Sequence, residues 1–164
     1  MSSRTPLPYS PKVLELFKNP INLGEMEDAS VIGRAGSPLC GDMIKLYLKI
    51  EDGLIKKATF ESYGCASNIA TASVLTTMLE NITLEEAWNI KMEELDEKLG
   101  GLPKVKHHCG TLAVGSLHRA IRKYHKDNNM EFPVWLPIDF TKDEKHAMEE
   151  EELAKQLAKK YGLI

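Results

Sequence analysis

The dipeptide Asp52-Gly53 restricts the fold more than any other feature of this chain, because it separates two runs of alternating apolar and polar residues. Asp-Gly is a strong signal for a two-residue hairpin turn, since both residues tolerate a positive φ. A period of two indicates strands with one buried face. The side chains predicted to share that face are Ile44, Leu46, Leu48 and Ile50 before the turn, and Ala58, Phe60 and Ser62 after it. The sequence therefore predicts two antiparallel strands joined by a tight turn.

The hydrophobic period changes from strand to helix after Tyr63-Gly64. Residues 65–80 and 111–125 show apolar side chains at helical spacing, Thr83–Glu86 has the pattern of a capping box, and 91–101 ends in two glycines. Residues 102–110 are predicted to form a loop. Near the N-terminus we expect a short helix capped by Ser10 and a short strand around 30–33. Strands followed by helices indicate an α+β fold, a small antiparallel three-stranded sheet with helices packed on one face.

Charge and composition exclude several function classes. The chain has 164 residues, a net charge of −3 and no run of basic residues, so nucleic-acid binding has no electrostatic basis. No stretch approaches the roughly 18 consecutive apolar residues of a membrane helix. The first ten residues have no apolar segment typical of a signal peptide. A cytoplasmic location is expected, without membrane or nucleic-acid partners.

The chain has three cysteines, Cys40, Cys65 and Cys109, and all three fall at the ends of predicted elements rather than on apolar stripes. An odd number does not make a disulfide framework. Three buried free thiols would be the simplest interpretation. The positions favour a site instead, because a helix N-terminus has unpaired N–H groups that stabilise anions and lower the pKa of a cysteine.

Other potential ligands flank the cysteines. Asp42 follows Cys40 by two residues, and His107-His108 precede Cys109. Strict alternation would place His107 on the side of Cys109, but a loop-to-helix boundary leaves the choice open. Thiolates, a carboxylate and an imidazole suit iron, iron–sulfur clusters or zinc. The cysteines are too far apart in sequence for a zinc-finger or ferredoxin motif, so spacing alone identifies no metal.

Three segments together carry a resemblance to a known family: "GSPLCGD", "ESYGCASNIATAS" and "LPKVKHHC". In order and spacing they resemble the signatures of the IscU/NifU-type iron–sulfur cluster assembly scaffolds, and "YSPKVLELFKNPINLG" is similar to the opening helix of that family. The resemblance runs from about Tyr9 to Tyr124 and implies a SufE/NifU-like fold. It also implies a scaffold rather than an enzyme. Such a scaffold builds a [2Fe–2S] cluster from iron, sulfur from a cysteine desulfurase and electrons from a donor such as ferredoxin. It then transfers the cluster to apo iron–sulfur acceptor proteins.

The resemblance also implies particular site residues. The matched cluster ligands are Cys40, Asp42, Cys65, His108 and Cys109. Cys109 matches the usual sulfur acceptor, Lys106 matches a lysine beside the site, and zinc often occupies the apo form. Asp42 is a hard ligand for a soft cluster, so we expect it to keep the cluster labile.

The chain departs from the family pattern at two positions. Lys104 stands where the chaperone-recognition loop usually has its second proline, which puts docking of an Hsp70-type chaperone in doubt. Gly110 follows Cys109 where many relatives have a larger side chain.

The sequence divides into a scaffold domain at 1–130 and a C-terminal extension at 131–164, a Pro- and aromatic-rich connection followed by a charged helix. That helix has Leu153, Leu157 and Tyr161 on one side. The extension is either a solvated acidic helix or is anchored by Trp135 and Phe140 to the body or to a second subunit, and a homodimer is an open alternative. Two other functions stay open: a zinc-bound persulfide sulfur carrier, and a structural zinc interaction module.

Overall fold

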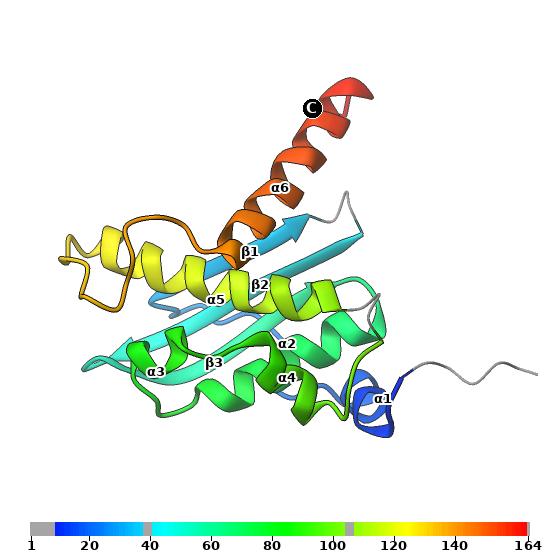
Figure 1. Ribbon diagram of the computed structural model, residues 1–164, viewed down its shortest axis with the longest axis horizontal. Helices are drawn as coiled ribbons and strands as arrows, with labels where there is room; N and C mark the ends of the chain where they lie inside the picture. The colour runs from blue at the N-terminus through cyan, green and yellow to red at the C-terminus, as the bar shows by residue number, and fades with distance from the viewer. Residues whose placement is uncertain (1–8, 38–40, 104–106, 164) are drawn as a thin grey trace, which may run out of the picture.

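The computed structural model describes residues 9–37, 41–103 and 107–163. Three antiparallel strands form one sheet in the order β1-β2-β3, and the helices cover one of its faces (Figure 1). The elements are α1 (Pro11–Lys18), β1 (Val31–Ser37), β2 (Asp42–Glu51), β3 (Leu54–Tyr63), α2 (Ala66–Leu79), α3 (Leu84–Trp88), α4 (Met92–Lys98), α5 (His107–Asp127) and α6 (Lys142–Lys160). The predicted α+β architecture is confirmed. None of the helices in the described ranges is long and apolar enough to cross a membrane.

The β2-β3 hairpin forms as the sequence predicts. Asp52 and Gly53 have φ of 53° and 73°, the left-handed conformations that a tight hairpin turn requires. The predicted apolar face is buried toward the helices, with Leu46 opposite Phe60 in the register and neither side chain exposed. These side chains and those of α2 and α5 make the core.

The third strand, β1, is longer than the short strand expected around 30–33. It pairs with β2 along its whole length, from Val31 opposite Leu48 to Ser37 opposite Asp42. It also lies very close to α5, because a Cβ added at Gly33 would lie less than 3.0 Å from the Ser116 carbonyl oxygen. This close approach fixes α5 over the sheet and so sets the position of the residues at its N-terminal end.

The prediction of a loop over 102–110 is wrong for residues 107–110. There, α5 already includes His107, His108, Cys109 and Gly110. Gly110 is not a helix breaker in this chain, since it faces the side chain of Met92 and leaves room for it. Lys104 and Lys106 lie outside the described residues.

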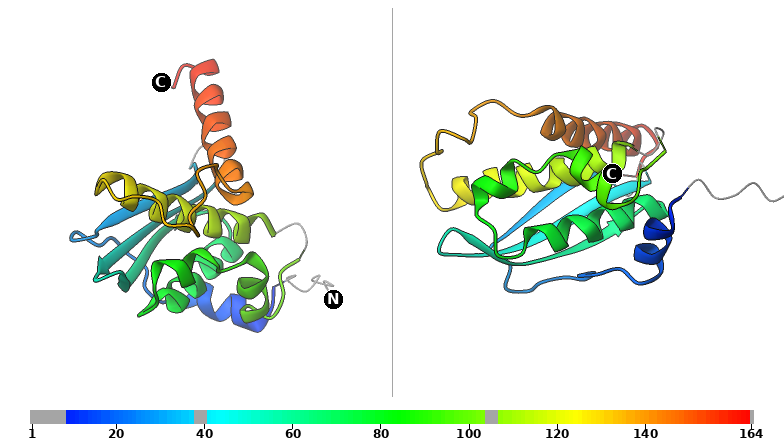
Figure 2. Two further views of the ribbon diagram at one scale, coloured as in Figure 1. Left: turned by 60° about the vertical axis from the view of Figure 1, so that its left-hand side comes forward. Right: turned by 60° about the horizontal axis from the view of Figure 1, so that its bottom comes forward.

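The C-terminal extension packs against β1 and α5 (Figure 2). Trp135 packs against the core beside Trp88 and His125, and Leu136 is buried. Phe140 lies over the Arg122 guanidinium and stays 41% exposed.

After the buried Glu144 in its first turn, the side of α6 that faces the body has small buried residues, Ala147, Ala154 and Ala158. The side with Leu153, Leu157 and Tyr161 is exposed instead. Sequence periodicity identifies residues that share a side of a helix, but it does not show which side faces the body. The close packing of α6 on the body favours the side with alanines over the side with leucines.

Candidate functional site

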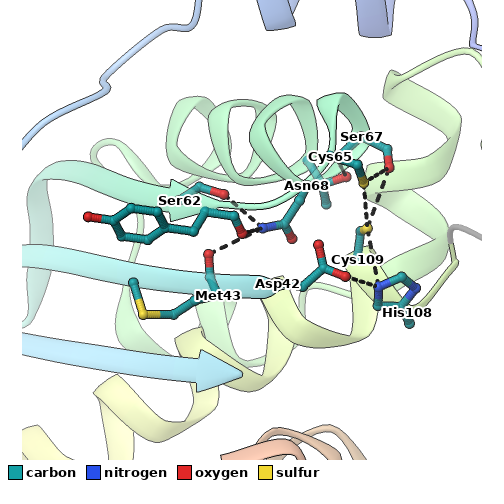
Figure 3. Close-up of polar contacts among 10 residues, drawn as sticks. Asp42, Met43, Ser62, Cys65, Ser67, Asn68, His108 and Cys109 are labelled. Carbon is teal, nitrogen blue, oxygen red and sulfur yellow. Dashed lines mark hydrogen bonds and ion pairs between the residues drawn. The ribbon is translucent and has the colours of Figure 1, made fainter. Parts of the chain in front are cut away.

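Three elements far apart in the sequence meet at one end of the sheet (Figure 3). Asp42 is the first residue of β2, and Cys65 is the N-cap of α2. His108 and Cys109 lie at the start of the described part of α5. The structure therefore brings together four of the five predicted ligands. The fifth, Cys40, lies outside the described residues, as does Lys106.

Two thiols form the inner part of the site. The Cys65 and Cys109 Sγ atoms are 4.0 Å apart, about twice the length of a disulfide bond, so the two sulfurs are not bonded to each other. The Ser67 hydroxyl lies 3.0 Å from the Cys65 sulfur and 3.5 Å from the Cys109 sulfur. Ser67 is fully buried and was not predicted from the sequence. Its position two residues after a junction cysteine was the only signal that could have drawn attention to it.

A carboxylate–imidazole pair forms the outer part. His108 Nε2 donates to Asp42 Oδ2 at 2.8 Å, and the same nitrogen lies 3.8 Å from the Cys109 sulfur. His107 turns away from the site, with its Nε2 3.1 Å from the Leu102 carbonyl oxygen and 3.9 Å from Asp96 Oδ2. The helix explains why His107 points away from Cys109, because side chains two residues apart in a helix point about 200° apart around its axis. Alternation would have favoured His107, whereas the structure places His108 beside Cys109.

The turn between β3 and α2 is shaped to admit the Asp42 carboxylate. Gly64 has a φ of 140°, which L side chains rarely adopt, and an added Cβ would lie less than 3.0 Å from Asp42 Oδ1. Asn68 Nδ2 lies 3.2 Å from the Met43 carbonyl oxygen, 3.0 Å from that of Tyr63 and 2.7 Å from the Ser62 hydroxyl. This buried amide therefore joins the ends of β2 and β3 to α2 and fixes the position of Asp42 relative to Cys65.

Packing explains Gly110, the second departure from the family pattern. A Cβ added at Gly110 would lie less than 3.0 Å from Met92 Cγ. The Met92 side chain, from the first residue of α4, therefore lies against the helix turn next to Cys109. A larger residue at position 110 would require Met92 to move.

The electrostatic environment of Cys109 differs from the expected one. Burial raises the pKa of the Cys109 thiol to about 12; the Ser67 hydrogen bond lowers it, and the nearby Cys65 and Asp42 raise it. The expectation that a helix N-terminus would favour the thiolate is wrong for Cys109, because desolvation outweighs it. A bound metal ion removes the proton from a coordinating thiol outright, so metal binding and ionisation of Cys109 would be coupled.

The donor set combines soft and hard ligands, as iron and iron–sulfur clusters accept. Within the part of the chain that the structure describes, no three Asp, Glu, His or Cys side chains are arranged to hold one metal ion. The Asp42 oxygen and the His108 nitrogen bind each other instead. If these two atoms separated, both could ligate a metal beside the two thiols.

The chain is similar to known proteins over most of its length. Residues 8–131 match the family described as the NifU-like N terminal domain. The iron-sulfur cluster assembly scaffold protein IscU 1 of Archaeoglobus fulgidus is 46% identical over 120 residues, which are 73% of this chain and 78% of that protein. The scaffold protein IscU of Azotobacter vinelandii is 43% identical over 123 residues, covering 72% and 95%.

The fold has solved counterparts as well. The crystal structure of a nitrogen-fixing NifU-like protein (N-terminal) from Brucella abortus superposes with a TM-score of 0.57 at 21% identity, covering 71% of this chain and 94% of that one. This likeness concerns the fold alone. The family match and the identities over most of the chain go further: this protein belongs to the NifU-like N-terminal domain family.

Proposed function

We propose that this protein is a scaffold on which an iron–sulfur cluster is assembled and from which the cluster passes to acceptor proteins. Its relatives in Archaeoglobus and Azotobacter are named as such scaffolds. The observation that carries the proposal is the convergence of Cys65 and Cys109, with sulfurs 4.0 Å apart, beside the Asp42–His108 pair. The cluster is the cargo of the protein, so the site must both accept and release it.

The proposed ligands are Cys40, Asp42, Cys65 and Cys109, with His108 able to replace Asp42. Cys40 enters from the sequence alone, two residues before Asp42. Four ligands complete the coordination of a [2Fe–2S] cluster. Entry of iron would break the Asp42–His108 hydrogen bond, and either the Asp42 carboxylate or the His108 imidazole would then ligate iron.

Sulfur would reach the site as a persulfide on a cysteine desulfurase. The Cys109 thiolate attacks the outer sulfur of that persulfide, the sulfur–sulfur bond breaks, and the desulfurase cysteine leaves as a thiolate. A donor such as ferredoxin supplies two electrons for each transferred sulfur, which reduce it to sulfide. Because Cys109 is buried and Cys65 is partly exposed, transfer to Cys109 requires local opening at the site. Lys106, three residues before Cys109, is the nearby cation that the family pattern places there.

The remaining parts of the proposal follow from the scaffold role. Residues 1–130 form the scaffold domain and 131–164 an extension of it. The apo form binds zinc through the same thiols. The protein works in the cytoplasm and hands its cluster to apo iron–sulfur proteins, without turning over a substrate as an enzyme does. A zinc-bound persulfide carrier is the weaker alternative, because that branch lacks the histidine before the last cysteine.

Reconstitution tests the proposal. The apo protein is mixed anaerobically with ferrous iron, cysteine and a desulfurase, and the visible spectrum is recorded before and after adding an apo-ferredoxin. A [2Fe–2S] absorption that moves to the acceptor supports a scaffold. Persulfide formation without any cluster would contradict it and would support the zinc-bound carrier. His108→Ala should weaken cluster retention, whereas His107→Ala is the matched control and should not, since His107 faces Leu102 and Asp96.

The role proposed for Asp42 has its own test. Asp42→Ala removes the hard ligand, so we expect a longer-lived cluster that transfers more slowly to apo-ferredoxin. The cluster half-life in air and the transfer rate are measured on the same preparation. An unchanged transfer rate would show that Asp42 does not control release.

A further inference from the structure

The outward side of α6 combines exposure with large apolar residues. Leu153, Leu157 and Tyr161 are 51%, 39% and 70% exposed, although the same helix buries Ala154 and Ala158 against the body. The second half of α6 extends beyond the sheet and the other helices in Figure 1 and in the left view of Figure 2. A row of large apolar side chains on a protruding helix is typical of a protein interaction surface.

Over residues 149–160 of α6, the acidic residues all come in the first part and the basic residues in the second. Four consecutive glutamates occupy 149–152, while Lys155, Lys159 and Lys160 are the only charged residues from 153 to 160. Two copies of such a helix attract each other when they run antiparallel, because each acidic half then lies beside the basic half of the other.

We propose that the outward side of α6 binds the same side of a second copy of this chain. The two helices run antiparallel, and the two-fold axis crosses them at the level of Lys155 along the helix. Leu153 and Leu157 are equally far from Lys155 along the chain, so each Leu153 lies opposite Leu157 of the second copy. The four leucines then form one apolar contact at the centre. This is an isologous interface, in which both chains use the same surface.

The position of the charges around the helix selects this partner. At 100° per residue, Glu149 and Lys160 lie only about 20° apart around the axis, on one flank of the leucine row. In the antiparallel pair each Glu149 therefore lies beside Lys160 of the second copy, and the symmetry makes two such ion pairs. Both side chains are exposed on the single chain. An anionic membrane surface fits less well, because the four glutamates would be repelled by its lipids.

This interface lies outside residues 8–131, which match the family, and uses none of the residues proposed to hold the cluster. It therefore stands or fails independently of the proposed function.

Sedimentation equilibrium of the full chain over a range of concentrations tests the inference. We expect a monomer–dimer equilibrium in the native protein. Leu153→Glu combined with Leu157→Glu should raise the dissociation constant by at least about 100-fold, because four buried leucines are replaced by like charges. Val134→Glu is the matched control at another exposed apolar position and should leave the equilibrium unchanged. Circular dichroism and thermal unfolding check that each variant is folded.

A charge exchange tests the antiparallel register. Glu149→Lys and Lys160→Glu should each weaken the dimer about tenfold by placing like charges together twice, and the double variant should restore it. A native protein that is monomeric at every concentration overturns the inference. So does a dimer that survives both leucine substitutions, a double variant without restored affinity, or a monomer that uses α6 to bind vesicles containing phosphatidylserine.

Discussion

Replacing Glu144 with alanine should destabilise the whole protein, because Glu144 neutralises the buried Arg122. The side chain of Arg122 is 5% exposed, and all five N–H groups of its guanidinium have acceptors. Two go to the Glu144 carboxylate at 2.7 and 2.9 Å, and three go to the carbonyl oxygens of Pro137, Ile138 and Asp139 at 2.8 to 3.2 Å. Arg122, on α5, therefore binds both the segment that connects α5 to α6 and the start of α6.

The loss in the free energy of unfolding is set by the buried Arg122 that remains without its partner. Glu144→Ala keeps the buried cation and removes its one carboxylate partner among the described residues, a change that costs about 3–5 kcal/mol in proteins. For a chain of this length each kcal/mol corresponds to roughly 2–4 °C in the melting temperature. The expected decrease is therefore about 6–20 °C. Glu151→Ala is the matched control: its ion pair with Arg119 at 2.9 Å is part-exposed, so the loss should stay below about 1 kcal/mol.

Thermal and urea unfolding of the two variants provide the measurement, and the dependence on pH adds a second one. Burial raises the pKa of Glu144, but the hydrogen bonds from Arg122 and from the Thr141 backbone lower it more, so the folded-state pKa lies below the ordinary value. A lowered carboxyl pKa stabilises the fold above the ordinary pKa, and this contribution is lost as the pH falls through the folded value. The advantage of the native protein over Glu144→Ala should therefore shrink in acid. Equal losses for Glu144→Ala and Glu151→Ala at neutral pH would refute the reasoning.

Two further predictions concern the glycines that shape the site. Gly64→Ala should cost about 1–3 kcal/mol and weaken ferrous iron binding in anaerobic titration, because it strains a positive φ and displaces the Asp42 carboxylate. Gly101→Ala shares the positive φ of 91° but meets no atom of the described residues, so it should lower stability without weakening iron binding; equal effects on binding would contradict the account. Gly110→Ala should cost about 1–3 kcal/mol by overpacking against Met92, and Met92→Ala in the same chain should recover part of that loss in urea unfolding. Strictly additive losses would show that the two residues do not compete for space.

The hairpin and the convergence of distant ligands could be predicted from the sequence for different reasons. The Asp52-Gly53 turn and the alternation around it are local signals, and the structure follows them closely. The grouping of Asp42 with Cys65 and Cys109 could not come from local patterns, since these residues are far apart in the chain. It came from the positions of the cysteines at element ends and from the resemblance of three segments to one family.

Other features depend on packing that the sequence does not encode locally. The choice between His107 and His108 depends on where α5 begins. The loop predicted over 102–110 depends on it too, because Gly110 lies inside α5 and leaves room there for Met92. The side of α6 that faces the body was not predictable from periodicity, because alanines and leucines share the helix and only the available space decides between them. Ser67 has only a weak signal in the sequence, its position two residues after Cys65, and its contact with both sulfurs comes from the structure alone.

The pairing within the site suits a scaffold that must be filled and emptied. Without a cluster, the ligand atoms of Asp42 and His108 bind each other, and both thiols lie within hydrogen-bonding distance of Ser67. Buried polar groups that keep partners do not incur the cost of an unsatisfied site. Release of a cluster would therefore not leave an isolated charge among these groups. On the proposed function, the exchange of the Asp42–His108 pair for iron ligation keeps the difference in free energy between the filled and empty states small, and a small difference is what transfer to an acceptor requires.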